Sequence, residues 1–154
     1  MRSARLFVTF FYLGYSKIAP GSIASLVTTL IFYLFAKYVF FSLLIIIILV
    51  TTILSFIAVG VYTSGSSEKD KSEIVIDEVI GQSIALSPLL LFPEYNLPEF
   101  YMCLISLLFF RFFDIVKPFP INEVDKINSN FGVILDDILA GFFSAIFLTL
   151  ILNL

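Results

Sequence analysis

The chain alternates long apolar runs with short polar stretches, and five apolar segments stand out. They cover residues 23–36, 39–62, 74–92, 100–116 and 131–154. A helix needs about 20 residues, within a range of about 17–25, to cross a membrane. Two of the segments reach this length only with flanking residues. They are segment 23–36 and residues 79–92, the part of segment 74–92 that follows its acids. Because lipid offers the backbone no hydrogen bonds, each segment that crosses is expected to be helical.

A shorter apolar stretch, residues 6–15, precedes these segments and follows two arginines, Arg2 and Arg5. Such a start resembles a signal peptide, but no small-x-small cleavage site follows and Lys17 interrupts the run. We therefore expect Leu6–Tyr15 to form an interfacial or re-entrant helix.

Composition strengthens the prediction of a membrane protein. Hydrophobic residues make up 60% of the 154 residues and charged residues only 14%, whereas about 25% of an average soluble domain is charged. A soluble protein could not be covered by so little polar surface, and disordered chains are poor in apolar residues. The sequence predicts an all-α fold, a small polytopic membrane helix bundle of about five apolar helices plus an N-terminal interfacial helix, with residues 1–154 as one domain. The net charge of −3 argues against nucleic acid as a partner.

The basic residues fall on one side of the membrane when the segments are threaded across it in turn. A turn at Lys37 makes a hairpin of the first two segments, and a turn at residues 93–98 joins the third and fourth. Eight bases then share the side of the N-terminus: Arg2, Arg5, Lys17, Lys69, Lys71, Arg111, Lys117 and Lys126. Lys37 lies on the other side, so the positive-inside rule makes the basic side cytoplasmic.

Two acid pairs lie on this cytoplasmic side in similar surroundings. Asp77 and Glu78 are part of Ile74-Val-Ile-Asp-Glu-Val-Ile-Gly81, and Asp136 and Asp137 are part of Val133-Ile-Leu-Asp-Asp-Ile-Leu-Ala-Gly141. A helix start tolerates carboxylates because its dipole is positive there, so the acids could simply mark two helix entries. Carboxylates bracketed by Ile, Val and Leu are, however, costly at membrane depth and usually functional. Crowded carboxylates also repel one another unless a cation or proton neutralises them.

Asp114 adds a fifth acid, and the chain contains no His. Acids without His favour a hard, oxygen-ligated cation, and Mg²⁺ fits best. Arg111, Asp114 and Lys117 stand at i, i+3 and i+6, so that neighbours share a helix face. They form either a local ion-pair ladder or a metal-binding Asp flanked by phosphate-binding cations. Pro118 and Pro120 are expected to end this helix.

Gly21 and Ser22 precede the first long apolar segment, in Lys17-Ile-Ala-Pro-Gly-Ser22. Free backbone N–H groups at a helix start can bind an anion. Alternatively, Ser22 is an ordinary helix N-cap. Together with the acids and cations, this stretch points to phosphoryl chemistry at the membrane surface, because metal ions and cations stabilise a transferring phosphoryl group.

Four blocks of the sequence, in this order, resemble the phosphatidylglycerophosphatase A family. They are Ala19-Pro-Gly-Ser-Ile-Ala-Ser-Leu26, Ile76-Asp-Glu-Val-Ile-Gly81, Arg111-Phe-Phe-Asp-Ile-Val-Lys-Pro-Phe-Pro-Ile121 and Gly132-Val-Ile-Leu-Asp-Asp-Ile-Leu-Ala-Gly141. The resemblance implies an all-α, Mg²⁺-dependent lipid phosphatase of the bacterial inner membrane. Such an enzyme hydrolyses phosphatidylglycerophosphate to phosphatidylglycerol and inorganic phosphate, a step of phospholipid biosynthesis.

This family resemblance suggests roles for nine residues. Asp77, Glu78, Asp114, Asp136 and Asp137 would form the acidic catalytic site and bind Mg²⁺, Arg111 and Lys117 would bind phosphate oxygens, and Ser22 and Gly21 would add contacts to the substrate. The residues leave open whether water or an aspartate is the nucleophile.

A small cation transporter, with the acids as its ion path, is the alternative function. Transporters usually carry inverted repeats and acids near the midplane, whereas the two similar helices here enter from the same side. A non-catalytic membrane subunit would leave the acids unexplained. Beyond the phospholipid substrate and the membrane, no obligate protein partner is expected.

Overall fold

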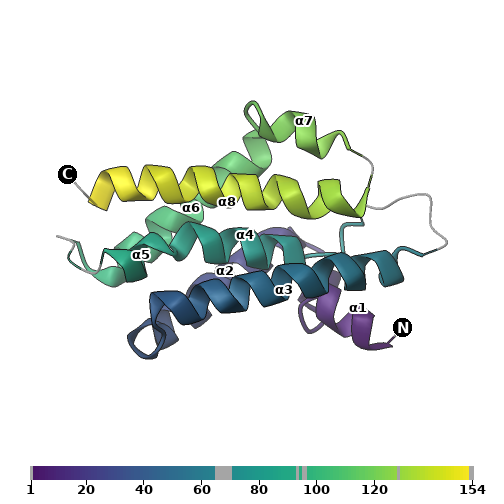
Figure 1. The fold of residues 1–154 in the computed structure, drawn as a ribbon, viewed down its shortest axis with the longest axis horizontal. Coiled ribbons are helices and arrows are strands. Elements are labelled where there is room, and N and C mark those ends of the chain that lie inside the picture. The colour runs from purple at the N-terminus through teal and green to yellow at the C-terminus, as the bar shows by residue number, and fades with distance from the viewer. Residues whose placement is uncertain (1, 65–70, 93, 95–96, 128, 153–154) are drawn as a thin grey trace.

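The computed structural model describes residues 2–64, 71–92, 94, 97–127 and 129–152, and these form helices and no strand (Figure 1). The helices are α1 (Arg2–Val8), α2 (Pro20–Phe35), α3 (Phe41–Tyr62), α4 (Ile76–Leu86), α5 (Pro88–Leu91), α6 (Glu99–Val116), α7 (Ile121–Asp125) and α8 (Asn130–Leu152), with 3-10 turns η1 (Leu13–Tyr15) and η2 (Ala36–Tyr38). The predicted all-α bundle is confirmed.

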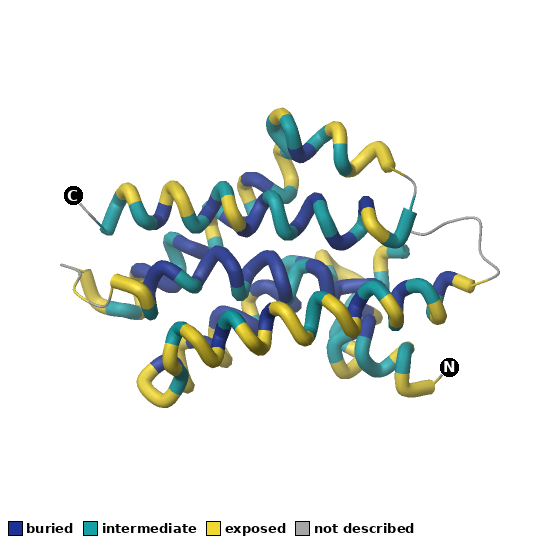
Figure 2. The backbone as a smooth tube through the Cα atoms, viewed as in Figure 1, coloured by how far each residue is buried: buried dark blue, intermediate teal, exposed yellow. Residues whose placement is uncertain are grey.

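Helix α4 lies in the middle of the bundle and contacts α2, α3, α6 and α8. Figure 2 shows that most residues of α4 are buried, whereas buried and exposed residues alternate along α3. Because its neighbours surround α4, the acids in its first turn are withdrawn from lipid.

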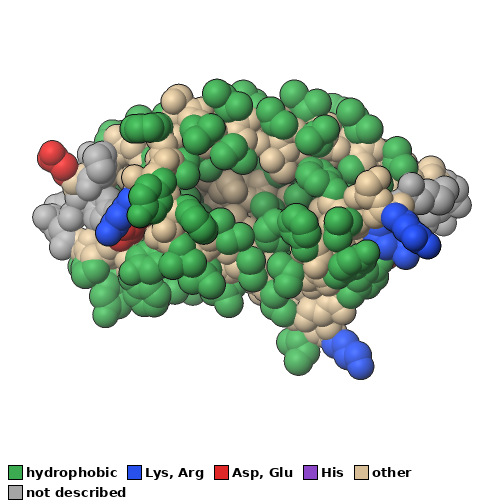
Figure 3. Space-filling view, turned by 90° about the horizontal axis from the view of Figure 1, so that it is seen from below, with side chains coloured by type: hydrophobic (Ala, Val, Ile, Leu, Met, Phe, Trp, Pro, Cys, Tyr) green, Lys and Arg blue, Asp and Glu red, His purple; other side chains and the backbone are tan. Residues whose placement is uncertain are grey.

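Three helical stretches within the described residues are long and apolar enough to cross a membrane: Pro20–Tyr38, Phe41–Tyr62 and Asn130–Leu152. Helix α3 exposes a row of large apolar side chains, with Ile46, Ile53 and Ile57 between 56% and 62% exposed. Figure 3 shows that hydrophobic side chains cover most of this face, and that charged ones gather toward its ends. Such a surface suits contact with lipid and supports membrane association.

The predicted segments correspond to the helices with one exception. Segments 23–36, 39–62, 100–116 and 131–154 largely coincide with α2, α3, α6 and α8, although Ala36 belongs to η2, residues 39–40 precede α3 and residues 153–154 are outside the described part. Segment 74–92 is not one helix, because α4 ends at Leu86 and α5 begins at Pro88. A proline ring clashes with the carbonyl four residues earlier, here that of Ile84, and breaks the hydrogen-bond ladder.

The single helix predicted over residues 6–15 is wrong. Helix α1 already ends at Val8, and Phe10, Phe11 and Tyr12 have positive φ angles of 43°, 56° and 70°. A right-handed helix cannot continue through left-handed residues. The Thr9 hydroxyl also donates to the Arg5 carbonyl and accepts from the Tyr12 N–H, which favours a local turn.

The polar stretches gather at one end of the bundle, as threading predicts. Figure 1 shows the N-terminus, the end of α3 and the starts of α4 and α8 at that end, and the α2–α3 turn and the C-terminus at the other. Val75 N–H donates to Val8 O at 2.9 Å, which ties the chain before α4 to the end of α1. Lys69 and residues 93, 95 and 96 of the predicted turn lie outside the described residues.

Candidate active site

A cavity of ≈ 480 Å³ lies where the starts of α2, α4 and α8 meet the end of α6 and α7. Of the nine predicted site residues, Gly21, Asp77, Glu78, Arg111, Asp114, Lys117, Asp136 and Asp137 line it, whereas Ser22 does not. Residues from the four polar stretches, which are far apart in the sequence, therefore lie together around one cavity, as predicted.

Two glycines bring α4 and α8 together beneath this cavity. A Cβ atom on Gly141 would collide with the carbonyl oxygen of Gly81, and one on Gly81 would lie 2.6 Å from the Asp137 carbonyl oxygen. Small residues let membrane helices approach this closely. Asp77 and Asp137 each precede one of these glycines by four residues, about one helical turn. Both acids therefore lie next to the crossing.

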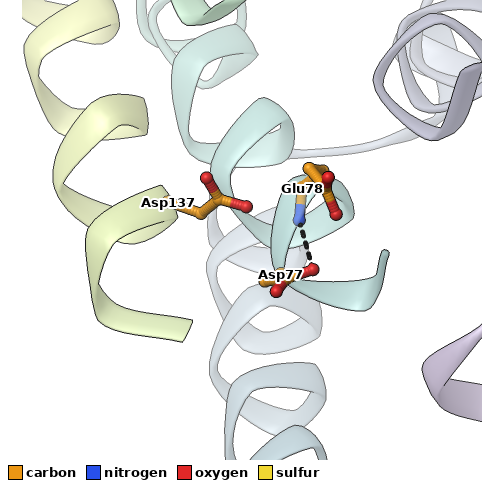
Figure 4. Close-up of side chains that lie close together, drawn as sticks. All are labelled: Asp77, Glu78 and Asp137. Atoms are coloured by element: carbon orange, nitrogen blue, oxygen red, sulfur yellow. Dashed lines mark hydrogen bonds between the residues drawn. The ribbon is translucent and has the colours of Figure 1, made fainter. Parts of the chain in front are cut away.

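Asp77, Glu78 and Asp137 form a compact group of carboxylates, the acid triad. One carboxylate oxygen from each lies within 4.8 Å of the others, and Asp137 points from α8 toward the first turn of α4 (Figure 4). Asp77 and Asp137 are 6% and 4% exposed. Glu78 N–H donates to Asp77 Oδ1 at 3.1 Å, which fixes the Asp77 carboxylate against its own helix start.

The acid triad suits a hard divalent cation such as Mg²⁺. Its donors are all carboxylate oxygens, which are the ligands that Mg²⁺ prefers. Glu78 Oε2 is buried and has no hydrogen-bond partner within the described part of the chain. A buried carboxylate oxygen without a partner is costly, and a bound cation would remove this cost.

The start of α2 packs directly on Glu78. A Cβ atom at position 21 would overlap the Glu78 carboxylate, so a larger residue there would force this carboxylate to move. Helix α2 begins at Pro20, whose fixed φ suits a first helical position, and Ala19 is its N-cap, with φ 43°. The reading of Ser22 as N-cap is therefore wrong, because Ser22 already lies inside the helix. Its contact with substrate stays a prediction.

Arg111 and Asp114 form an ion pair on α6, with 2.6 Å between Arg111 Nη1 and Asp114 Oδ2. Arg111 Nε is buried and has no hydrogen-bond partner among the residues that the structure describes. A guanidinium carries five N–H donors, so Arg111 retains donors for an anion in the cavity.

Lys117 does not take part in the ion-pair ladder that the spacing of Arg111, Asp114 and Lys117 suggests. Helix α6 ends at Val116, as Pro118 predicts, and Lys117 follows with a φ of 46°. Its Nζ donates to Asp136 Oδ2 on α8 at 2.7 Å and to Asp125 at the end of α7. Asp114 and Lys117 are therefore not partners, and the alternative of a continuous ladder along α6 is wrong.

The two carboxylates also stabilise the charged form of Lys117, which lies beyond the end of α6. Burial disfavours the ammonium, but its hydrogen bonds to Asp125 and Asp136 outweigh this effect and raise the pKa of Lys117. Lys117 is therefore a cation at neutral pH. Asp136 Oδ1, on the other side of the same carboxylate, is buried without a hydrogen-bond partner in the described residues.

Sequence reasoning did not assign three charged residues that line the cavity, namely Lys71, Asp125 and Lys126. In the sequence, Lys71 and Lys126 contribute only to the positive charge of the predicted cytoplasmic side. Asp125 lies on a short helix with no acid pair or glycine beside it, so the sequence offered no signal for it. Its link to the site is the contact with Lys117, which only the fold reveals.

A helical bundle with membrane-length helices and a cavity of carboxylates and basic groups at one end fits a membrane enzyme that acts on phosphate esters. The family model for Phosphatidylglycerophosphatase A matches residues 6–152. The chain belongs to this family and is a phosphoric monoester hydrolase.

Curated relatives agree with the family. Phosphatidylglycerophosphatase A of Haemophilus influenzae is 35% identical over 83% of this chain and 76% of its own length. Phosphatidylglycerophosphatase A of Escherichia coli is 31% identical over 86% of this chain and 73% of its length. A Bacteroides thetaiotaomicron protein named "Putative phosphatidylinositol-3-phosphatase" is 33% identical over 86% of this chain and 83% of its length. No solved structure matches the chain. None of these findings supports a cation transporter.

Proposed function

We propose that this protein hydrolyses phosphatidylglycerophosphate to phosphatidylglycerol and inorganic phosphate, with Mg²⁺ as its cofactor. The observation that carries the proposal is one cavity holding three clustered carboxylates together with Arg111 and Lys117. The names of two relatives support the choice of substrate.

The acid triad of Asp77, Glu78 and Asp137 would hold the metal. Without a cation these carboxylates repel one another at their observed spacing. When bound there, Mg²⁺ would stabilise the negative charge that develops on the phosphoryl oxygens.

Lys117 and Arg111 are suited to bind the phosphate group. An ammonium has three N–H donors, and Lys117 gives two of them to Asp125 and Asp136. The third donor is left for a phosphate oxygen, and Arg111 Nε is a second donor without a partner in the described residues. Because carboxylates already hold both side chains, little ordering is needed when substrate binds.

Asp136 is the carboxylate that we assign as general base. In the reaction, the oxygen of water bonds to phosphorus while the ester bond between phosphorus and the glycerol oxygen breaks. Asp136 Oδ1 accepts the proton of the attacking water, because it is buried in the cavity wall and unpartnered among the described residues. The leaving glycerol oxygen takes up a proton from solvent water, and Asp136 returns its proton to solvent, so the hydrolysis balances.

We further propose that the protein resides in the bacterial inner membrane with the cavity on the cytoplasmic face. The distribution of bases supports this orientation. The cavity lies at an end of the bundle, where the head group of a lipid reaches the membrane surface, while the apolar faces of α3 and its neighbours contact the acyl chains.

Phosphate release from two lipids tests the substrate. Purified protein in detergent micelles would be given phosphatidylglycerophosphate or phosphatidylinositol 3-phosphate, each with Mg²⁺ or with EDTA. We expect Mg²⁺-dependent release that is faster from phosphatidylglycerophosphate. Preference for the inositol lipid would contradict the proposed substrate and favour the activity in the name of the Bacteroides relative. Equal rates with EDTA would contradict the proposed cofactor.

A further inference from the structure

Asp125 is a charged residue of the cavity wall to which the proposed reaction assigns no chemical step. It ends the short helix α7, which packs against α8. Its carboxylate accepts a hydrogen bond from Lys117, and the Asp136 carboxylate accepts another from the same ammonium at 2.7 Å. Lys117 is therefore held from two helices, α7 and α8.

Lys117 lies just beyond the end of α6. Lys117 follows the last turn of α6 with a left-handed backbone, so no helical hydrogen-bond ladder continues beyond it. Its side chain is flexible and carries a compact charge, so the groups that hydrogen-bond the ammonium determine where it lies. With Asp136 as its sole partner, the ammonium would be held from α8 alone, by the carboxylate that we assign as the base.

We propose that Asp125 is a positioning residue for Lys117: it balances the attraction of Asp136 and leaves the third N–H of the lysine directed at the substrate phosphate. This inference rests on the proposed function, because it assumes a phosphate group in the cavity. Asp125 acts through Lys117 and need not touch the substrate.

Glu123 provides a matched control on the same helix. It pairs with Lys126 at 2.8 Å, and both side chains are more than half exposed. Its replacement also removes one carboxylate from α7, but it leaves both hydrogen bonds of Lys117 in place.

Binding of inorganic phosphate tests the proposal without turnover. Titration calorimetry in detergent with Mg²⁺ would compare the wild type with Asp125→Asn, Asp125→Glu, Glu123→Gln, Lys117→Met and the double variant Lys117→Met/Asp125→Asn. We expect Asp125→Asn to weaken phosphate binding about tenfold, because a charge-assisted hydrogen bond is lost. Asp125→Glu should restore most of the affinity, and Glu123→Gln should leave it unchanged.

The double variant separates positioning from a general structural role. If Asp125 acts through Lys117, its replacement should add no further loss when Lys117 is already Met. In steady-state kinetics, Asp125→Asn should raise KM for the lipid phosphate more than it lowers kcat.

Three results would overturn the proposal: wild-type protein that binds no phosphate, full affinity in Asp125→Asn, or losses that add in the double variant. Phosphate binding as expected, without release of phosphate from any lipid, would instead contradict the proposed function and leave the role of Asp125 supported.

Discussion

Gly141 lies against the backbone carbonyl of Gly81, and this contact sets how closely the two acid pairs approach. A Cβ atom on Gly141 would overlap that carbonyl oxygen. Asp77 and Asp137 stand one turn before the two glycines, so the close crossing of α4 and α8 brings both carboxylates into the acid triad. The two glycines therefore determine how closely the carboxylates of the two helices approach one another.

Replacing Gly141 with Ala should separate α4 from α8. Because the new methyl group meets backbone, neither helix can yield by a side-chain rotation, and overpacking of this kind costs about 1–3 kcal/mol. We expect a lower midpoint of thermal unfolding in detergent and a loss of phosphate release. Phe142→Ala, on an exposed position of the same helix, is the control. Unchanged stability and activity in Gly141→Ala would contradict the role of the crossing.

Gly21 and Ser22 should respond differently to replacement by Ala. A methyl group at position 21 meets the Glu78 carboxylate and would displace a carboxylate of the acid triad. We expect Gly21→Ala to raise the Mg²⁺ concentration for half-maximal activity about tenfold, as loss of support for a metal ligand often does. Ser22 does not line the cavity, so Ser22→Ala should need the same Mg²⁺ concentration for half-maximal activity as the wild type. A larger shift in the Mg²⁺ titration for Ser22→Ala than for Gly21→Ala would contradict the role of Gly21.

Lys117→Met should destabilise the protein equally at neutral and mildly alkaline pH. The pKa of Lys117 is raised by its two carboxylates, above the unfolded value of about 10.4. Its pairing therefore stabilises the fold fully below that unfolded pKa, and this contribution is lost only as the pH rises through the folded pKa. We expect a deficit of about 1–2 kcal/mol from the lost charged hydrogen bonds. Thermal unfolding of the wild type and the variant between about pH 7 and 9 measures this loss of stability. A loss that vanishes by pH 9 would indicate that Lys117 is neutral there.

The orientation in the membrane can be tested with single cysteines. The chain has one cysteine, Cys103, which is buried, so Cys103→Ala is a suitable background. Cysteine at position 37 should react with a membrane-impermeant thiol reagent in intact cells, because Lys37 lies on the predicted outer side. Cysteine at position 17 should react only after lysis. The reverse pattern would place the cavity on the outer face.

Much of this architecture could be predicted from the sequence, since apolar run length determines where lipid-facing helices form. The acid pairs were recognisable because carboxylates among Ile, Val and Leu are rarely accidental. Their partners were harder to predict. The i, i+3 spacing suggested that Asp114 pairs with Lys117, yet the left-handed backbone at Lys117 ends the helix and turns the lysine toward Asp125 and Asp136.

Local backbone geometry accounts for the other errors. Pro88 divides a segment whose hydropathy is continuous, and Thr9 makes a turn where hydropathy favours a helix. The pairing of α4 with α8 was not predicted either, although the glycine that follows each acid pair is a signal for it. Hydropathy describes the surroundings of a segment, whereas these features depend on single residues.

Metal-dependent phosphate release tests the central claim, that the acid triad is a metal-dependent phosphatase centre, most directly. Wild type and Asp137→Asn would be compared for release of phosphate from phosphatidylglycerophosphate in micelles across a titration of Mg²⁺, with thermal unfolding as the check of folding. We predict release that requires Mg²⁺, and a folded variant whose rate falls by about 10²-fold or more. Release that persists in EDTA, or a folded Asp137→Asn as active as the wild type, would contradict the account.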